Sequence, residues 1–193
     1  MIDVTDTDLR ALSNWDTPTI CNALEIINPE RRGFGYTIKP FSCLSPRLPP
    51  IIGYARTAKI RAAQPTKSSI DRLTYYEYVA ADPMPAIIIM EDIDPTPGYG
   101  AFWGEVQTNV HMGLGAVGCV TNGAYRDIKD SAPGFQLLGG MIGPSHAYIH
   151  LVEIDCQVNI HGMKVDPGDI IHADQHGAVI IPRQAVAKIP TTI

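Results

Sequence analysis

The sequence predicts a layered α/β domain with a central β-α-β unit and a β-rich C-terminal part. Residues 86–90 and 116–121 are short apolar runs bounded by turn-forming residues, which is typical of buried parallel strands. The stretch between them is long enough for the crossover that parallel strands require. Beyond residue 135, strand-like segments alternate with Gly and Pro turns. We therefore expect a single domain over residues 1–193.

The remaining elements follow from capping residues and hydrophobic spacing. Asp6 or Thr7 is suited to cap a first helix, and Asp16, two residues before Pro18, is suited to start a second. The other expected segments, in chain order, are the end of this second helix at 28, a loop over 29–51, a strand over 51–62, a helix over 68–81, a helix over 101–112 ending at Gly113, and strands over 135–139, 147–154, 156–160 and 169–181.

Composition and charge narrow the class of protein. The net charge is −5 and the isoelectric point is about 5.6, without the clustered Lys and Arg of a nucleic-acid surface, so no nucleic-acid partner is expected. The sequence contains no apolar run of about 18 residues, so we expect no membrane span. The N-terminal segment lacks a basic and an apolar region, which argues against a secretory signal and favours a cytoplasmic location.

The cysteines do not form a metal or disulfide pattern. Cys21, Cys43, Cys119 and Cys156 are too far apart in sequence for a C-x-x-C pair. A zinc knuckle and a disulfide scaffold are therefore not expected. Cys119 lies inside an apolar run, where we expect a small core residue.

The loops after the two central strands carry the candidate site. In a right-handed crossover these loops meet at one edge of the sheet, where ligands bind in open α/β folds. The first loop passes through Gly98, Gly100 and Gly104 into a helix, whose free backbone amides attract a carboxylate or phosphate. The second loop ends in Arg126 and Asp127. We therefore expect an anion cradle, a guanidinium and a carboxylate to converge.

These groups suit chemistry on 2-oxo acids. Arg126 is able to hold a carboxylate or polarise a ketone oxygen. Asp127, together with Glu105, offers the oxygen ligands that Mg²⁺ or Mn²⁺ prefers. A cation bridging a 2-oxo group and a carboxylate stabilises an enolate, which is the hard step in cleaving the bond beside a pyruvyl unit. The alternative is a surface turn with an ordinary ion pair.

A lysine nucleophile is disfavoured. Such a lysine needs burial to lower its pKa, and the candidates Lys39, Lys59 and Lys67 lie outside clearly apolar runs. The residues therefore favour the metal-dependent class of aldolase over the Schiff-base class.

Several segments, in order along the chain, resemble one known family. Gly104-Glu105, twenty further residues and then Arg126-Asp127 are similar to its D-x20-R-D signature. The other matching segments are DTPTICNAL at 16–24, GYART at 53–57, VTNGAYRD at 120–127, VDPGD at 165–169 and ADQHG at 173–177. Over about residues 10–183 the chain thus resembles the 4-hydroxy-4-methyl-2-oxoglutarate aldolases, which are related to the regulators of ribonuclease activity A.

The resemblance implies a swivelling β/β/α fold, assembled as a homotrimer or a dimer of trimers. It implies a site in the cleft between neighbouring subunits, where Asp127 ligates a divalent metal, Mg²⁺ or Mn²⁺. Arg126 is expected to bind the pyruvyl portion of the substrate, and Glu105 to act through a metal-bound water. The substrate carboxylate is expected to bind the backbone amides of Gly104, Glu105, Val106 and Gln107.

The chain departs from the family pattern in three places. Glu105 stands where the signature has Asp, which adds one methylene and shifts the expected water network. Asn22 replaces a usual Asp, which we interpret as a structural difference. The sequence ends at Ile193, before the C-terminal helix of many members, so the acid that they contribute across subunits has no assigned counterpart.

The histidines offer further candidates. His172, Asp174 and His176 share one face of a strand and form either a second metal site or, as we favour, a polar face or turn. His146 and His150 have the spacing of a helical zinc pair, but their context is strand-like. Either of these two is a candidate proton donor facing the cleft.

The aromatic side chains near the loops have two interpretations. Phe102, Trp103 and Tyr125 either line the pocket or pack in the core.

The sequence thus predicts a lyase that acts on small 2-oxo acids, by aldol cleavage or decarboxylation, and gives pyruvate through an enolate. The first alternative is a non-catalytic regulator that binds an RNA-processing enzyme. Related enolate chemistry on another substrate is the second alternative.

Overall fold

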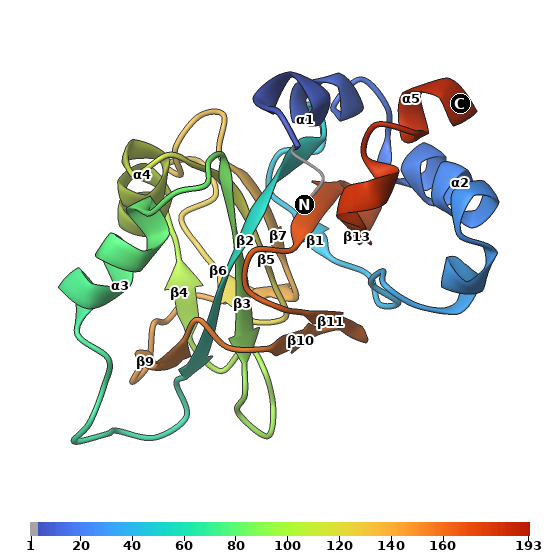
Figure 1. The fold of residues 1–193 in the computed structure, drawn as a ribbon. Coiled ribbons are helices and arrows are strands. Elements are labelled where there is room, and N and C mark those ends of the chain that lie inside the picture. Colours follow the sequence, from blue (N-terminus) through green and yellow to red (C-terminus); the bar gives the residue numbers. More distant parts are fainter. Residues whose placement is uncertain (1–3) are drawn as a thin grey trace.

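A mixed eight-stranded sheet forms the centre of the computed structural model, which describes residues 4–193 (Figure 1). The strand order is β1-β7-β5-β3-β2-β12-β13, and β9 also pairs with β2. Its strands are β1 (Ser42–Cys43), β2 (Ile51–Arg61), β3 (Ala86–Asp92), β5 (Ala116–Thr121), β7 (Gln136–Gly139), β9 (His150–Ile154), β12 (Ile170–Asp174) and β13 (Gly177–Ile181). Residues 1–3, which begin the segment used to argue against a secretory signal, lie outside the described part.

The parallel centre of the sheet contains the predicted β-α-β unit, which is formed by β3, the helix α4 (Glu105–Gly113) and β5. β2, β3, β5 and β7 pair in parallel, while β1, β9, β12 and β13 join through antiparallel pairs. Two smaller sheets accompany it, one of them parallel and the other an antiparallel hairpin. Their strands are β4 (Ala101–Trp103), β6 (Ala124–Tyr125) and β8 (Met141–Ile142), and β10 (Val158–Ile160) and β11 (Met163–Val165). The predicted layered α/β class is confirmed.

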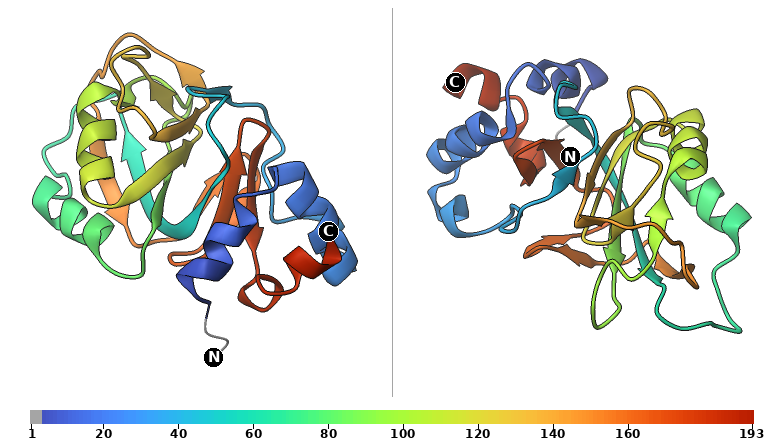
Figure 2. Two further views of the ribbon diagram at one scale, coloured as in Figure 1. Left: turned by 90° about the horizontal axis from the view of Figure 1, so that it is seen from above. Right: turned by 180° about the vertical axis from the view of Figure 1, so that it is seen from behind.

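The helices form two groups at opposite ends of the molecule, as Figure 2 shows. The first group packs with β12 and β13, and the second covers β3 and β5. The first group comprises α1 (Asp6–Leu12), α2 (Thr17–Ile27) and α5 (Ile189–Thr192). The second comprises α3 (Arg72–Ala80) and α4 (Glu105–Gly113). Two short 3₁₀ turns are η1 (Pro29–Gly33) and η2 (Arg183–Ala185). Among residues 4–193, no helix has the length and apolar character needed to cross a bilayer.

β3 shows why its apolar run is continuous. Successive side chains of a strand point to opposite faces of the sheet. Ile88 and Met90 pack in the cluster beneath α3 and α4, whereas Ile87 and Ile89 pack against the β10–β11 hairpin. Both faces of the strand are therefore covered, as the sequence predicted.

Three predicted boundaries were wrong. The N-cap of α1 is Thr5, not Asp6 or Thr7, and it forms a reciprocal capping box with Asp8. The predicted helix over 101–112 is a strand followed by a helix, because residues 101–103 pair with β6 before α4 begins. The strand expected over 169–181 is the β12–β13 hairpin.

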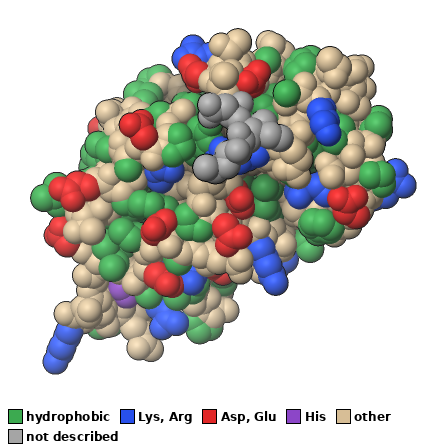
Figure 3. Space-filling view, viewed as in Figure 1, with side chains coloured by type: hydrophobic (Ala, Val, Ile, Leu, Met, Phe, Trp, Pro, Cys, Tyr) green, Lys and Arg blue, Asp and Glu red, His purple; other side chains and the backbone are tan. Residues whose placement is uncertain are grey.

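The surface in Figure 3 carries acidic and basic side chains interspersed with apolar ones. On this face the two signs of charge are mixed, so no wide area of one sign is visible.

A buried arginine joins β2 to the end of α3. Arg56 is 4% exposed, and its guanidinium donates to the carbonyl oxygens of Tyr78 at 3.2 Å, Pro83 at 3.0 Å and Ala81. Carbonyls at a helix C-terminus attract a cation because the helix dipole is negative there. Arg56 thereby fixes the position of α3 and of the loop that enters β3.

We expect Arg56→Met to lower the free energy of unfolding by about 3 kcal/mol, because several buried carbonyls lose their donor. Urea unfolding measures the change, with Arg47→Met as the control because Arg47 is exposed. An equal loss in both variants would contradict the role assigned to Arg56.

Candidate functional site

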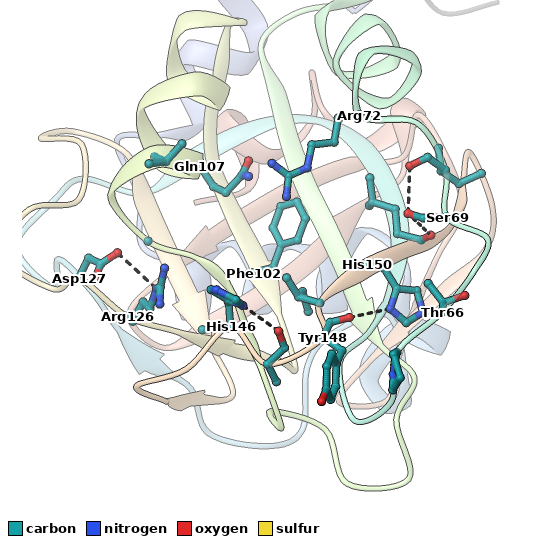
Figure 4. Close-up of a pocket in the computed structure, with 18 residues that line it drawn as sticks. Thr66, Ser69, Arg72, Phe102, Gln107, Arg126, Asp127, His146, Tyr148 and His150 are labelled. Atoms are coloured by element: carbon teal, nitrogen blue, oxygen red, sulfur yellow. Dashed lines mark hydrogen bonds and ion pairs between the residues drawn. The ribbon is translucent and has the colours of Figure 1, made fainter.

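A cavity of about 620 Å³ lies where the loops after β3 and β5 meet. Gly104 lines it from the first loop, and Arg126 and Asp127 line it from the second. This confirms that the two loops share one edge of the sheet. Residues 65–72, before and within α3, and residues 146–151 supply the other walls (Figure 4).

The carboxylate of Asp127 lies at the start of α4. Its Oδ2 accepts the backbone N–H of Glu105 at 3.2 Å and lies 3.5 Å from the Nε of Arg126. A Cβ on Gly104 would lie 2.4 Å from this oxygen, so glycine is needed for the close approach. Gly104 itself is extended, with φ −179°, so space rather than backbone conformation is the constraint.

A strained turn holds Asp127 in place. Its φ of 54° lies in the left-handed region, which Asp tolerates better than most residues. Its carbonyl oxygen accepts the backbone N–H groups of Asp130 at 3.1 Å and Ser131 at 2.9 Å, and the Ser131 hydroxyl at 2.9 Å. These three bonds keep the carboxylate turned toward α4.

The first turn of α4 keeps free donors. Gly104 is the N-cap and has no side chain to cap the helix, and Asp127 takes only the Glu105 amide. Among the described residues, the amides of Val106 and Gln107 have no acceptor. Two backbone donors at a helix N-terminus therefore remain for an anionic ligand.

Two guanidinium groups border the cavity. Arg126 is attached to β4 because its backbone N–H donates to the Trp103 carbonyl at 3.0 Å. Its side chain is 37% exposed. Arg72, the first residue of α3, enters from another side, and Phe102 lies below it in Figure 4. Sequence reasoning missed Arg72. One feature of the sequence could have identified it. A cation in the first turn of a helix is unfavourable for the helix dipole, which suggests that Arg72 serves ligand binding and not helix stability.

The other predicted residues of the first turn differ in position. The side chain of Glu105 is exposed and is not part of the cavity lining, whereas Val106 and Gln107 line it. The Tyr76 hydroxyl donates to Oε1 of Gln107 at 3.2 Å, which fixes this side chain. Within residues 4–193, Glu105 therefore bonds to Asp127 through its backbone N–H and not through its side chain.

Asp127 is the group that fits a divalent cation. Its Oδ1 accepts no hydrogen bond from the described residues, and the side chain is 37% exposed. Mg²⁺ commonly uses one or two protein carboxylates and completes its shell with water and substrate oxygens. The single carboxylate fits that pattern, and Arg126 beside it is suited to a substrate anion.

His111 supports α4 from the core. Its Nδ1 lies 2.7 Å from the carbonyl oxygen of Gln107, so this nitrogen carries the hydrogen, and Nε2 lies 2.9 Å from the Tyr75 hydroxyl. Burial lowers the pKa of His111 to about 4, so the ring is neutral near pH 7 and Nε2 accepts from Tyr75. An uncharged buried network thus holds the first turn of α4.

His146 and His150 both line the cavity, but not on a helix. His146 lies in a loop and His150 begins β9, so the helical zinc pair considered from spacing does not form. Each Nδ1 lies 2.8 Å from a backbone carbonyl, that of Ala147 for His146 and that of Tyr148 for His150.

His172, Asp174 and His176 have structural positions. His172 is fully buried, with Nδ1 3.0 Å from the Thr17 hydroxyl, and burial lowers its pKa. Asp174 accepts the Thr17 backbone N–H at 2.8 Å and lies 3.0 Å from the His176 ring. Within residues 4–193, no group of three or more His, Cys, Asp or Glu side chains is arranged to hold a metal, so this second candidate does not form.

The aromatic candidates divide between core and cavity. Trp103 and Tyr125 are buried in the cluster beneath α3 and α4, and the Tyr125 hydroxyl lies 2.9 Å from that of Ser42. Phe102 lines the cavity.

A family model described as RraA-like, Aldolase/RraA, matches residues 17–180. The chain belongs to the RraA-like family. Protein DlpA of Legionella pneumophila is 26% identical to this RraA-like chain over 188 residues, which cover 94% of the chain and 28% of that protein. An uncharacterized protein of Methanocaldococcus jannaschii is 33% identical over 91 residues, which cover 46% and 44%. The matched residues thus cover less than half the length of each of these two relatives.

Solved structures share the RraA-like fold. RraAS2 of Streptomyces coelicolor, described as an unusual member of the RNase ES inhibitor RraA family, aligns with a TM-score of 0.75 at 20% identity, over 98% of this chain and 91% of that one. An uncharacterized protein of Pseudomonas syringae gives 0.74 at 20% identity, over 100% and 87%. The RNA-processing inhibitor RraA from Thermus gives 0.61 at 20% identity, over 84% and 92%. The expected family and fold are confirmed.

We expect Gly104→Ala to weaken Mn²⁺ binding about 10-fold or more, because the new Cβ displaces the Asp127 carboxylate. Electron paramagnetic resonance titration of Mn²⁺ measures this affinity. Gly113→Ala is the control, since a Cβ at this other glycine of α4 meets nothing within 4 Å. Unchanged Mn²⁺ binding in Gly104→Ala would show that the close approach does not position the ligand.

We expect the protein to lose stability as the pH falls from about 6.5 to about 4. Unfolded His111 gains a proton near its ordinary pKa, whereas burial delays protonation in the folded state to about 4. The loss at pH 5 is about 2 kcal/mol. Urea unfolding at pH 7 and pH 5 should show a smaller loss in His111→Gln than in the unaltered protein. The lowered pKa of His172 acts in the same direction in both proteins, so parallel losses would refute the assignment to His111.

Proposed function

We propose that this RraA-like protein is a divalent-metal-dependent lyase. It cleaves the C3–C4 bond of a small 2-oxo acid, the bond next to the pyruvyl unit, by aldol cleavage or decarboxylation, and releases pyruvate. The observation that carries the proposal is the Asp127 carboxylate held between Arg126 and the Glu105 amide, next to two free amides of α4, at the edge of a cavity.

Each group has a role in substrate binding. Arg126 and the amides of Val106 and Gln107 bind the carboxylate of the 2-oxo acid. Asp127 holds Mg²⁺ or Mn²⁺, which when bound supplies a positive charge that stabilises the developing enolate. Glu105 acts through a water, which agrees with its exposed side chain beside the Asp127 turn.

The charge of the cavity supports an anionic substrate. Arg72 and Arg126 line it with one carboxylate, that of Asp127. The Asp127 carboxylate is already paired with Arg126 and the Glu105 amide, which reduces its repulsion of an anionic substrate. A cavity of about 620 Å³ also has room for a substrate larger than pyruvate itself.

We propose assembly as a homotrimer or a dimer of trimers, and the exposed apolar rim of the cavity supports contact between copies of the chain. Val106, Ile128, Ile142 and Tyr148 lie beside the Arg126–Asp127 turn or line the cavity, and each is about half exposed or more. Apolar side chains gathered around a cavity commonly mark a surface that another chain covers. We infer that a neighbouring subunit covers the open side of the site.

A non-catalytic regulator of an RNA-processing enzyme is the second candidate. Two solved structures with this fold are described as RNA-processing or RNase inhibitors. The two candidates differ in whether Asp127 and a metal are needed, so one variant decides between them.

We expect Asp127→Asn to lower metal-dependent pyruvate release from oxaloacetate and from 4-hydroxy-4-methyl-2-oxoglutarate by about 100-fold or more. Asn tolerates the left-handed backbone of this position, so the turn is kept. Pyruvate release is measured with Mg²⁺, with Mn²⁺ and with a chelator, and Asp130→Asn is the control for a neighbouring exposed carboxylate.

The outcomes separate the candidates. If neither substrate turns over while Mn²⁺ still binds through Asp127, the substrate is a different 2-oxo acid. If there is neither turnover nor metal binding, the lyase is refuted and the regulator is favoured.

A further inference from the structure

The segment 145–149 is held firmly against the cavity by its backbone. The Ala101 backbone N–H donates to the Ser145 carbonyl at 2.8 Å, and the Ile149 N–H donates to the His146 carbonyl at 3.1 Å. A Cβ on Gly100 would lie 2.5 Å from the His146 carbonyl oxygen, so glycine permits this close contact. The position of His146 is therefore set by the strand β4 that also leads to α4.

The backbone next to His146 is strained. Ala147 has φ 46°, a left-handed conformation that is unusual for alanine, and its N–H donates to the Ser145 hydroxyl at 3.0 Å. Strain of this kind persists only where the surroundings over-determine it, and it gathers at functional sites.

One ring nitrogen of His146 is left for a ligand. Nδ1 lies 2.8 Å from the Ala147 carbonyl oxygen, which can only accept, so Nδ1 carries a hydrogen. Nε2 has no partner among the described residues. His146 lines the same cavity as Arg126, and its ring lies between Arg126 and Phe102 in the view of Figure 4.

We propose that His146 carries the proton in the reaction, an inference that rests on the proposed lyase function. In aldol cleavage, Nε2 takes the proton of the substrate 4-hydroxyl as the C3–C4 bond breaks, and the electron pair of that bond becomes the enolate. The Nε2–H bond then breaks as the proton moves to C3 of the enolate, which gives pyruvate and returns a neutral ring.

The other groups around the cavity suit this step less well. The guanidinium groups of Arg72 and Arg126 are hydrogen-bond donors only and have no acceptor atom to take a proton. The carboxylate of Asp127 is engaged by Arg126 and the Glu105 amide. His150 has a similar Nδ1 bond, but in Figure 4 it lies beside Thr66, away from Arg126.

Exchange of the pyruvate methyl hydrogens in D₂O with Mg²⁺, followed by proton NMR, reports the enolate step without carbon–carbon cleavage. We expect His146→Gln to slow the exchange about 100-fold while circular dichroism remains unchanged. His146→Ala should regain exchange when free imidazole is added, because the acid–base group is restored. His176→Gln is the matched histidine control, since that ring lies at the β12–β13 turn.

A labelling experiment gives a readout that does not depend on turnover. Diethyl pyrocarbonate should modify His146 in the metal-free protein, and pyruvate should protect His146 but not His176, as peptide mass spectrometry shows. Full exchange in His146→Gln, or exchange lost only in His150→Gln, would overturn the proposal. Absence of exchange and turnover in the unaltered protein would instead refute the lyase function, and this inference with it.

Discussion

The structure of the site depends on the Asp127 carboxylate lying against the start of α4. Three features meet there. A left-handed turn directs the carboxylate toward the helix, Gly104 has no side chain in its path, and the Glu105 amide donates a hydrogen bond to it. A helix N-terminus is partly positive, so the carboxylate is stabilised without being buried. Because Asp127 takes only the Glu105 amide, the next two donors stay open.

The layers of the fold fix the positions of the Asp127 turn and of α4. β3 and β5 are parallel neighbours, so their following loops lie at one edge of the sheet. Beneath α4, His111 ties the Gln107 carbonyl to Tyr75 of α3, and burial lowers the pKa of this ring to about 4, so that the ring is uncharged near pH 7. Arg56 fixes the opposite end of α3 to β2. The site therefore rests on contacts that are themselves buried.

The cavity combines side chains of two kinds, guanidinium donors and an imidazole ring. The guanidinium groups of Arg72 and Arg126 line it as donors suited to an anion, whereas one ring nitrogen of His146 has no partner among residues 4–193. In the proposed lyase, substrate binding and proton transfer belong to different side chains. Two solved structures that share this fold are described as an RNA-processing inhibitor and as a member of an RNase inhibitor family.

The sequence by itself determined the parallel centre of the sheet, since the run AIIIM is apolar on both faces, and it indicated that Gly104, Arg126 and Asp127 meet, since crossover geometry brings successive loops together. It did not determine that Phe102 and Trp103 form a strand, because pairing with β6 overrides helical spacing. It also did not locate Arg72 or choose between His146 and His150. Those positions depend on how α3 and the segment 145–149 pack around the cavity, and only tertiary contacts decide that.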